Sequence, residues 1–385
     1  MENISTRYFP FSIFHCFCGL IFRMKETVGI GIIGTGFARK VQIPAFLQCD
    51  GARIVSVASG HLTNAEAAAR EFNVGHFTDD WRETVAREDV NLVCITTPPD
   101  THFEMTLASL ENNKHVLCEK PMAMNVEQAR EMTRRAKEKN LLALIDHELR
   151  FQSGRKKTFE MLRAGVVGRI RHAKYTFRAP HRGDVNLPWN WWSDAQAGGG
   201  ALGAIGSHII DSLLWLSGAD ISQIFCQLQT HVKQRRDAKT NKMRAVTSDD
   251  EANMILRFAD SDLTEDATAN VSLSMVERPD YQHYVEFSGT TGALRVEYKG
   301  EVFAAEAGEE NWRQIENISL GTPIEGIGDT GFSRGFMEFA PEIVRAIREG
   351  RTEIENAATF ADGLKVQKIL DAARASNKQG CAVKV

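Results

Sequence analysis

The sequence predicts an α/β fold, with a doubly wound parallel sheet first and then an α+β domain built on a large, open and mostly antiparallel sheet. The first observation is a β-like apolar run, residues 30–33, that passes through Gly34-Thr35-Gly36 into a helical pattern. The second is the alternation of strand and helix patterns over about the next hundred residues, which is typical of parallel βαβ units. The third is period-two patterning in several segments beyond Asp220, which is typical of antiparallel strands.

Length and composition set the broad class of protein. The 385 residues, of which 43% are hydrophobic, suffice for two domains. We place the first domain at residues 28–146 and the second at residues 147–385. The formal net charge of −4 gives no basic patch, so we expect no nucleic-acid partner. The 7 cysteines are scattered and odd in number, which argues against a disulfide framework and favours a reducing, cytoplasmic location.

The beginning of the chain needs separate treatment. Residues 8–22 are apolar and aromatic, but polar residues and Pro10 interrupt them, and the stretch is too short to span a bilayer. We therefore expect no membrane association. Met24 stands directly before the first strand. We expect translation to start at Met24, and we treat residues 1–27 as a non-native or disordered extension.

The segment 28–44 predicts a dinucleotide-binding turn between a strand and a helix. Gly34 can adopt backbone angles that other residues avoid, and Gly36 lets a pyrophosphate approach the main chain and the N–H groups of the helix. Arg39 replaces the third glycine of the usual fingerprint, so the surrounding βαβ pattern carries the prediction. The residues that we expect to contact the cofactor here are Gly34, Thr35, Gly36, Phe37 and Ala38.

The end of the second strand, residues 52–59, bears on the choice of cofactor. In nicotinamide-binding folds an acidic residue about 20 positions past the glycine turn binds the adenosine ribose and repels a 2′-phosphate. Here Ser59-Gly60-His61 occupies that place, and residues 53–64 contain no acid. We therefore favour NADP(H), with Ser59 and His61 donating to the phosphate. The alternative is that both residues only cap the helix expected at residues 65–72.

Two further loops end parallel strands at the same edge of the sheet. The strand 91–96 runs into Thr97-Pro98, and the strand 115–118 runs into Glu119-Lys120-Pro121, where proline cannot continue the ladder. Ligands bind at such strand ends in open α/β sheets. We thus expect Thr96, Thr97, Pro98, Glu119 and Lys120 at the cofactor. His102 is a candidate cofactor contact or a capping residue. The remaining elements are expected as helices at 80–86, 100–113 and 125–139 and a strand at 141–145.

The second domain begins with a helix at residues 151–162 and a strand at residues 170–177. The loop 178–197 that follows is rich in aromatic and basic groups, and tryptophan offers a flat apolar face suited to a sugar ring. Our candidate substrate contacts on it are Arg178, Trp191 and Trp192, and packing of the loop onto the sheet is an equally good explanation for either tryptophan.

The helix expected at residues 200–216 carries His208 and Asp211. Their spacing places both on one helical face, where a carboxylate can fix the tautomer of an imidazole. The alternative for His208 is a hydrogen-bonded core histidine. No third ligand is apparent, so we expect no metal site.

The rest of the chain completes the second sheet. We expect strands at 221–232, 250–258, 267–275, 281–288 and 293–297. The charged segment 233–250 is expected to form a mobile hairpin loop. Two closing helices are expected at residues 332–349 and 357–376.

Four motifs occur in combination: Gly34-Thr35-Gly36, Glu119-Lys120-Pro121, His147-Glu148-Leu149-Arg150-Phe151, and the glycine-rich segment 198–211 with His208 and Asp211. Together they resemble the glucose-fructose oxidoreductase, inositol dehydrogenase and rhizopine-catabolism (Gfo/Idh/MocA) family of NAD(P)-dependent oxidoreductases. The resemblance covers most of the chain from Val28 to about Ser376.

The resemblance implies a Rossmann domain followed by an α/β domain whose open sheet covers the cofactor and often makes the oligomer contact. We therefore expect a homo-oligomer, either a dimer or a tetramer. It also implies that Lys120 lies beside the nicotinamide and substrate and that His208 is the second catalytic group. Glu119 and Arg150 are counted with the cofactor-binding residues. The family usually has an aspartate four residues before the histidine, where this chain has Ala204, and Asp211 is our candidate to cover for it.

The function that we infer is reversible hydride transfer between NAD(P) and a hydroxyl-bearing carbon of a sugar, polyol or sugar acid. Lys120 is expected to polarise the oxygen and His208 to exchange the proton, although Ala204 leaves room for the two roles to be swapped. One alternative is a non-catalytic NAD(P)-binding sensor, like the repressors that the family resembles. Another is a redox-neutral enzyme in which tightly held NAD oxidises a sugar transiently to permit elimination.

Overall fold

The computed structural model describes residues 27–321, 324 and 326–385. The predicted start at Met24, the apolar stretch 8–22 and all but the last residue of the predicted extension 1–27 lie outside the described residues. Within the described part of the chain, no helix combines the length and the apolar character needed to cross a bilayer.

The first sheet has six parallel strands in the order β3-β2-β1-β4-β5-β6. This confirms the doubly wound parallel sheet that the sequence predicted. Its strands are β1 (Val28–Ile33), β2 (Ala52–Ala58), β3 (Phe77–Thr78), β4 (Leu92–Ile95), β5 (His115–Cys118) and β6 (Ala143–Ile145). The chain order reverses between β1 and β4, so the loops that follow these two strands diverge and leave a crevice between them.

Helices cover both faces of this sheet, which explains why its central strands are apolar throughout. The helices of the first domain are α1 (Ile43–Leu47), α2 (Leu62–Glu71), α3 (Trp81–Ala86), α4 (His102–Glu111) and α5 (Val126–Lys139). Helices α1 and α2 pack on one face, and α3, α4 and α5 pack on the other. The helix predicted after the glycine turn starts as a π-helical turn, Ala38–Gln42, and continues as α1.

The second sheet has nine strands in the order β16-β15-β14-β13-β7-β12-β11-β8-β17. Its strands are β7 (Ile170–Arg178), β8 (Ile221–Gln229), β11 (Glu251–Phe258), β12 (Thr264–Ser274), β13 (Gln282–Gly289), β14 (Gly292–Glu297), β15 (Val302–Glu306), β16 (Arg313–Gln314) and β17 (Val383–Lys384). Strands β7 and β12 run parallel, and the other pairs run antiparallel, as predicted.

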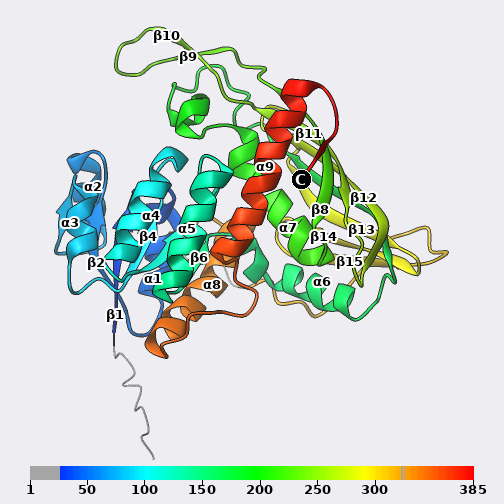
Figure 1. Cartoon of the computed structure of the whole chain (residues 1–385), viewed down its shortest axis with the longest axis horizontal. Helices are drawn as coiled ribbons and strands as arrows, with labels where there is room; N and C mark the ends of the chain where they lie inside the picture. The colour runs from blue at the N-terminus through cyan, green and yellow to red at the C-terminus, as the bar shows by residue number, and fades with distance from the viewer. Residues whose placement is uncertain (1–26, 322–323, 325) are drawn as a thin grey trace, which may run out of the picture.

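One face of the second sheet packs against helices α6 (Ser153–Arg163), α7 (Ser207–Ser217) and α9 (Phe360–Gln379). The other face is open and carries exposed apolar side chains, such as the cross-strand pair Phe225 and Ile255. Figure 1 shows α9 between the two sheets, where it contacts β8 on one side and α5 on the other.

Some short elements differ from the prediction. The segment predicted as a hairpin loop does form a hairpin, β9 (Gln234–Arg236) with β10 (Met243–Ala245), which projects at the top of Figure 1. Strands β3, β15, β16 and β17 were not predicted. Most of them are two residues long, so they contain too few positions to show a period, and they form only by pairing along an existing strand.

Helix α8 (Gly331–Arg348) follows the second sheet in the chain but packs against the first sheet. Its buried residues Phe336, Phe339 and Ile343 share a hydrophobic cluster with Ile30 and Phe46 from the start of the chain. A capping box at Thr330 and Ser333 fixes its first turn. The core beneath β1 therefore combines residues from both ends of the sequence.

Candidate active site

A cleft of about 890 Å³ lies where the two domains meet. The loops that follow β1, β4 and β5 form one wall, and the start of α7 with the tryptophan loop forms the other. The lining residues that the sequence analysis singled out are Gly34, Thr35, Gly36, Phe37, Ser59, His61, Thr96, Thr97, Pro98, Glu119, Lys120, Trp191, Trp192 and His208. This volume is in the range of about 300–1,000 Å³ that small-molecule and cofactor sites occupy.

Gly34 and Gly36 of the first turn are glycines for different structural reasons. Gly34 has φ +100°, and a Cβ on it would lie 2.6 Å from the main-chain carbon of Thr96. The Thr96 hydroxyl also donates a hydrogen bond of 2.8 Å to the Gly34 carbonyl, which ties the turn to the loop after β4. Gly36 has no atom within 4 Å of the place where a Cβ would stand. Its main chain is therefore open to the cleft, which fits the close approach of a phosphate group.

Ser59 and His61 line the cleft after β2, together with Lys40 and Asn64. His61 stands at the N-cap position of α2, but its side chain makes no capping hydrogen bond. The exposed Lys40 adds a cation that the sequence analysis had not identified. This end of the cleft thus combines a hydroxyl, an imidazole, an amide and an ammonium group.

The side chain of Lys120, in the first domain, contacts the second domain. Its Nζ donates a hydrogen bond of 3.2 Å to the main-chain carbonyl of Ala204, in the turn that leads into α7. The nearest carboxylate oxygen belongs to Glu119 and lies 3.9 Å away. The ammonium group is therefore held beside the position where an aspartate was expected, by main chain rather than by a side chain.

His208 contacts a second histidine. Its Nδ1 atom lies 3.4 Å from Nδ1 of His147, the residue that follows β6 by two positions. Both side chains are almost fully buried. Burial lowers the pKa of His147 to about 4, and burial together with the charge of Lys120 lowers the pKa of His208 well below its usual value. Both imidazoles are therefore neutral near pH 7.

Three buried carboxyl groups lie beneath Lys120. Burial raises the pKa of Glu119, Asp146 and Glu148. Charge repulsion from Glu148 and Glu119 further raises the pKa of Asp146, and repulsion from Glu119 further raises the pKa of Glu148. Gln42 donates a hydrogen bond of 2.7 Å to Asp146. Glu148 lines the cleft, and its Oε2 atom is buried without a hydrogen-bond partner in the described structure. Each of the three carboxyl groups therefore keeps its proton to a higher pH than an exposed carboxyl group does.

His102, a candidate cofactor contact, is fully buried behind the cleft wall. Its ring nitrogens lie 3.0 Å from the Pro121 carbonyl and 2.9 Å from the Thr97 carbonyl. The side chain therefore links the loops after β4 and β5, two of the loops that line the cleft.

Asp211 and Arg150 pair with each other. Arg150 donates from Nε to Asp211 Oδ2 at 2.9 Å and from a second nitrogen to Oδ1, and it also lies 3.4 Å from Asp362. Both carboxylate oxygens of Asp211 thus face the guanidinium, and no hydrogen bond links Asp211 to His208 in the described residues. Neither Arg150 nor Asp211 lines the cleft.

Two further candidates also lie outside the cleft lining. Ala38 is fully buried in the core of the first domain. Arg178 pairs with Glu277 and donates to Ser272 on the second sheet. Trp191 and Trp192 do line the cleft, and Trp192 also packs against the core of the second sheet. Trp192 therefore packs onto the sheet, and its place in the cleft lining leaves substrate contact as a prediction.

Several lining residues had no recognisable sequence signal. Phe332 at the start of α8 contacts the ring of His208 with centroids 5.0 Å apart. The cleft residues absent from our candidate sites are Lys40, Gly60, Asn64, Pro99, Pro121, Glu148, Asn190, Gly198, Ala204, Ile205 and Phe332. Lys40 is the one that spacing could have revealed, because it lies one helical turn after Gly36.

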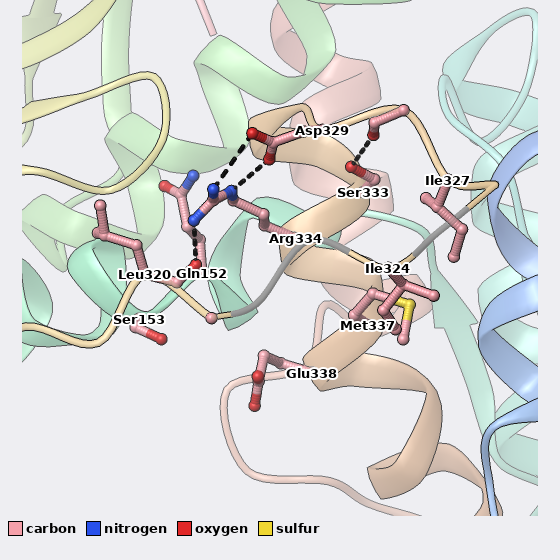
Figure 2. Close-up of a pocket in the computed structure, with 12 residues that line it drawn as sticks. Gln152, Ser153, Leu320, Ile324, Ile327, Asp329, Ser333, Arg334, Met337 and Glu338 are labelled. Carbon is pink, nitrogen blue, oxygen red and sulfur yellow. Dashed lines mark hydrogen bonds and ion pairs between the residues drawn. The ribbon is translucent and has the colours of Figure 1, made fainter.

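No group of three or more His, Cys, Asp or Glu side chains is placed to hold a metal ion in residues 27–321, 324 and 326–385. A second cavity, of about 150 Å³, lies between α8 and the loop before it, and Figure 2 shows its lining. Two of its charged lining residues, Asp329 and Arg334, pair with each other at 2.6 Å. This cavity is too small for a dinucleotide.

Two family models match the chain. The oxidoreductase family with an NAD-binding Rossmann fold matches residues 28–147, and the GFO/IDH/MocA C-terminal domain matches residues 156–295.

Similar proteins include an uncharacterized oxidoreductase of Synechocystis sp., 30% identical over 266 residues, which are 69% of this chain and 70% of that protein. Levoglucosan dehydrogenase of Pseudarthrobacter phenanthrenivorans is 28% identical over 383 residues, covering 90% of this chain and 95% of its own. The structure of a levoglucosan dehydrogenase in complex with NADH and levoglucosan superposes with a TM-score of 0.83 at 27% identity, covering 94% of this chain and 100% of that one.

Proposed function

Because the chain belongs to the Gfo/Idh/MocA family of NAD-binding oxidoreductases, we propose that it transfers a hydride between NAD(P) and a hydroxyl-bearing carbon of a sugar, polyol or sugar acid. The observation that carries the proposal is the cleft that Lys120 and His208 share with the glycine turn. Similarity to levoglucosan dehydrogenase, which has been crystallised with levoglucosan and with L-sorbose, supports a carbohydrate substrate.

The first domain would hold the cofactor. The open main chain at Gly36 would take the pyrophosphate, and the loops of Thr96 and Glu119 would contact the rest of the dinucleotide. When bound, the nicotinamide supplies the acceptor or donor of the hydride. Trp191 and Trp192 close the cleft from the second domain and offer apolar faces to a sugar ring.

Lys120 and His208 have different roles at the substrate oxygen. The Lys120 ammonium group donates one N–H to the Ala204 carbonyl and keeps its other donors for the substrate oxygen. His208 is neutral, so it has a bare nitrogen that can accept the hydroxyl proton. Loss of this proton makes hydride removal from the same carbon easier.

We further propose a preference for NADP(H). The end of the cleft after β2 has no carboxylate in its lining among the described residues, whereas Ser59, His61 and Lys40 offer donors and a positive charge to a 2′-phosphate.

The exposed Phe225 and Ile255 on the open sheet face support a homo-oligomer, either a dimer or a tetramer. The free thiols Cys49, Cys94, Cys118, Cys226 and Cys381 support a cytoplasmic location.

A screen of sugars and polyols with NAD and NADP tests the proposal through the absorbance of the reduced nicotinamide. A dehydrogenase gives a net change in absorbance with at least one substrate. A redox-neutral enzyme gives product without a net change, and a non-catalytic sensor binds the cofactor and gives neither. Either of the last two results would replace the proposed function.

A further inference from the structure

His147 is a buried titratable residue beside the proposed catalytic group. It lies between β6 and the short helical turn Glu148–Phe151, and its ring meets that of His208 edge to face, with centroids 5.3 Å apart and planes at 75°. The Nδ1 atoms are 3.4 Å apart. The hydrogen-bonding group beside Nδ1 of His208 is therefore another imidazole, where a carboxylate was expected.

The two rings must have different tautomers. A neutral imidazole carries a proton on one nitrogen, so a hydrogen bond between two Nδ1 atoms needs one ring protonated at Nδ1 and the other at Nε2. If His208 donates, its Nε2 is bare and His208 is ready to accept a proton from the cleft that it lines. If His147 donates, Nε2 of His208 carries a proton and can give it away. The pair thus has a proton-accepting state and a proton-donating state.

The charges around the two rings differ. The groups that act on His208 are Lys120, His147, His283 and Arg155, and all of them disfavour a positive charge there. The groups that act on His147 are Asp211 and Asp362, which favour a positive charge, and Arg150 and Lys120, which oppose it. The positive charge of an added proton is therefore more stable on His147 than on His208. The carboxylate of Asp211 attracts this charge on His147, even though Asp211 is also paired with Arg150.

We propose that His147 is a positioning residue that fixes the tautomer of His208 through the Nδ1–Nδ1 contact and takes over the proton that His208 receives. This rests on the proposed function. In the oxidation direction, the substrate O–H bond breaks and its proton binds Nε2 of His208, while the hydride leaves carbon with its electron pair for the oxidised dinucleotide and a C=O bond forms. The Nδ1–H bond of His208 breaks at the same time, and an Nδ1–H bond forms on His147. His208 ends neutral and His147 ends as an imidazolium.

The test compares His147→Leu with His147→Asn, and uses His231→Leu as the matched control at a mostly exposed histidine. Leucine removes the hydrogen bond, and asparagine keeps a hydrogen-bonding group that cannot take up a proton. On cofactor-free protein labelled with ¹⁵N at histidine, we expect NMR to show the His208 tautomer unchanged in the asparagine variant and altered in the leucine variant. Thermal melting confirms that each variant is folded.

The kinetic arm separates proton uptake from packing. We expect kcat to fall by about 10- to 100-fold in both His147 variants, as is usual when the partner of a functional histidine is lost, with the acidic limb of the pH profile displaced and with little change in the KM for the cofactor. The control should match the wild type. Full kcat in His147→Asn, or unchanged His208 signals in His147→Leu, would overturn the inference. A wild-type protein that turns over no sugar or polyol would overturn the proposed function and the proton transfer with it, while the NMR arm would still decide the pairing.

Discussion

The ammonium group of Lys120 donates its hydrogen bond to the main-chain carbonyl of Ala204, at 3.2 Å. Lys120 lies in the loop after β5 of the first sheet, and Ala204 belongs to the turn before α7 of the second domain. The hydrogen bond therefore joins the two halves of the cleft directly at the proposed site of reaction. Among the described residues, the carboxylate that pairs with this ammonium is that of Glu119, at 3.9 Å.

Replacing Lys120 by methionine removes the group that polarises the substrate oxygen. We expect kcat to fall by roughly 10²- to 10⁴-fold, which is the usual contribution of a positioned proton donor or acceptor. The affinity for NAD(P)H, measured by fluorescence titration, should stay close to that of the wild type. Lys139→Met is the matched control, because Lys139 is exposed at the end of α5, outside the cleft lining, and its loss should leave kcat unchanged. Full turnover in Lys120→Met would rule out the assignment.

Replacing Ser59 by aspartate tests the cofactor preference. A carboxylate at this position repels a 2′-phosphate and accepts hydrogen bonds from a ribose. We expect the Kd for NADPH to rise by at least about tenfold, since like charges in contact cost more than about 1 kcal/mol, whereas the Kd for NADH falls or stays constant. Titration of wild type and variant with both reduced cofactors measures this. If the ratio of the affinities for NADPH and NADH does not change, the adenosine end of the cofactor does not bind at Ser59.

Alanine at the two glycines of the first turn should give opposite results. Gly34→Ala puts a Cβ 2.6 Å from the Thr96 main chain at a positive φ, so we expect the free energy of unfolding to fall by about 1–3 kcal/mol. Gly36→Ala meets no neighbouring atom, so its melting temperature should match that of the wild type. Its methyl group points into the space of the cofactor, and its affinity for NAD(P)H should fall. Thermal melts and cofactor titrations separate the two effects, and a stable Gly34→Ala protein would contradict this account.

Replacing Glu148 by glutamine should change how stability depends on pH. Burial raises the pKa of this carboxyl in the folded protein, whereas the unfolded chain has the ordinary value of about 4. Above that pH the folded state keeps a proton that the unfolded state has lost. As the pH rises, the free energy of unfolding of the wild type therefore falls by about 1.4 kcal/mol per pH unit, until the carboxyl group of the folded protein also ionises.

Glutamine does not titrate, so the Glu148→Gln protein should melt at a temperature close to that of the wild type near pH 4 and higher than the wild type at pH 8. Glu88→Gln is the control at an exposed carboxylate, and its melting curve should follow the wild type at both pH values. A difference between wild type and Glu148→Gln that shrinks with rising pH would show the opposite sign and reject the explanation.

The sequence predicted the parallel sheet of the first half, because parallel strands follow a topological rule. The carboxyl ends of adjacent parallel strands share an edge, so Gly34, Thr96 and Lys120 had to lie near one another once their strands were recognised. The structure brings all three to the cleft. Period-two patterning likewise identified the main strands of the second sheet.

The sequence could not predict which side chains meet across the domains. Helical spacing showed that His208 and Asp211 share a face of α7, but not what lies opposite that face. The opposing residues, His147 and Arg150, are 61 positions earlier in each case, and their approach depends on how α7 docks onto the turn after β6. The contact of Phe332 with His208 likewise depends on how segments far apart in the sequence dock, so spacing along the chain could not predict it.

Helix α8 has a consequence for how the protein is made. The side chains of Phe336, Phe339 and Ile343 fill the space beneath β1, so the amino-terminal sheet lacks part of its interior until these residues have left the ribosome. A fragment that stops before α8 would leave Ile30 and Phe46 facing water instead of these aromatic rings. The nucleotide-binding half, although encoded first, therefore completes its hydrophobic core only after α8 has been synthesised.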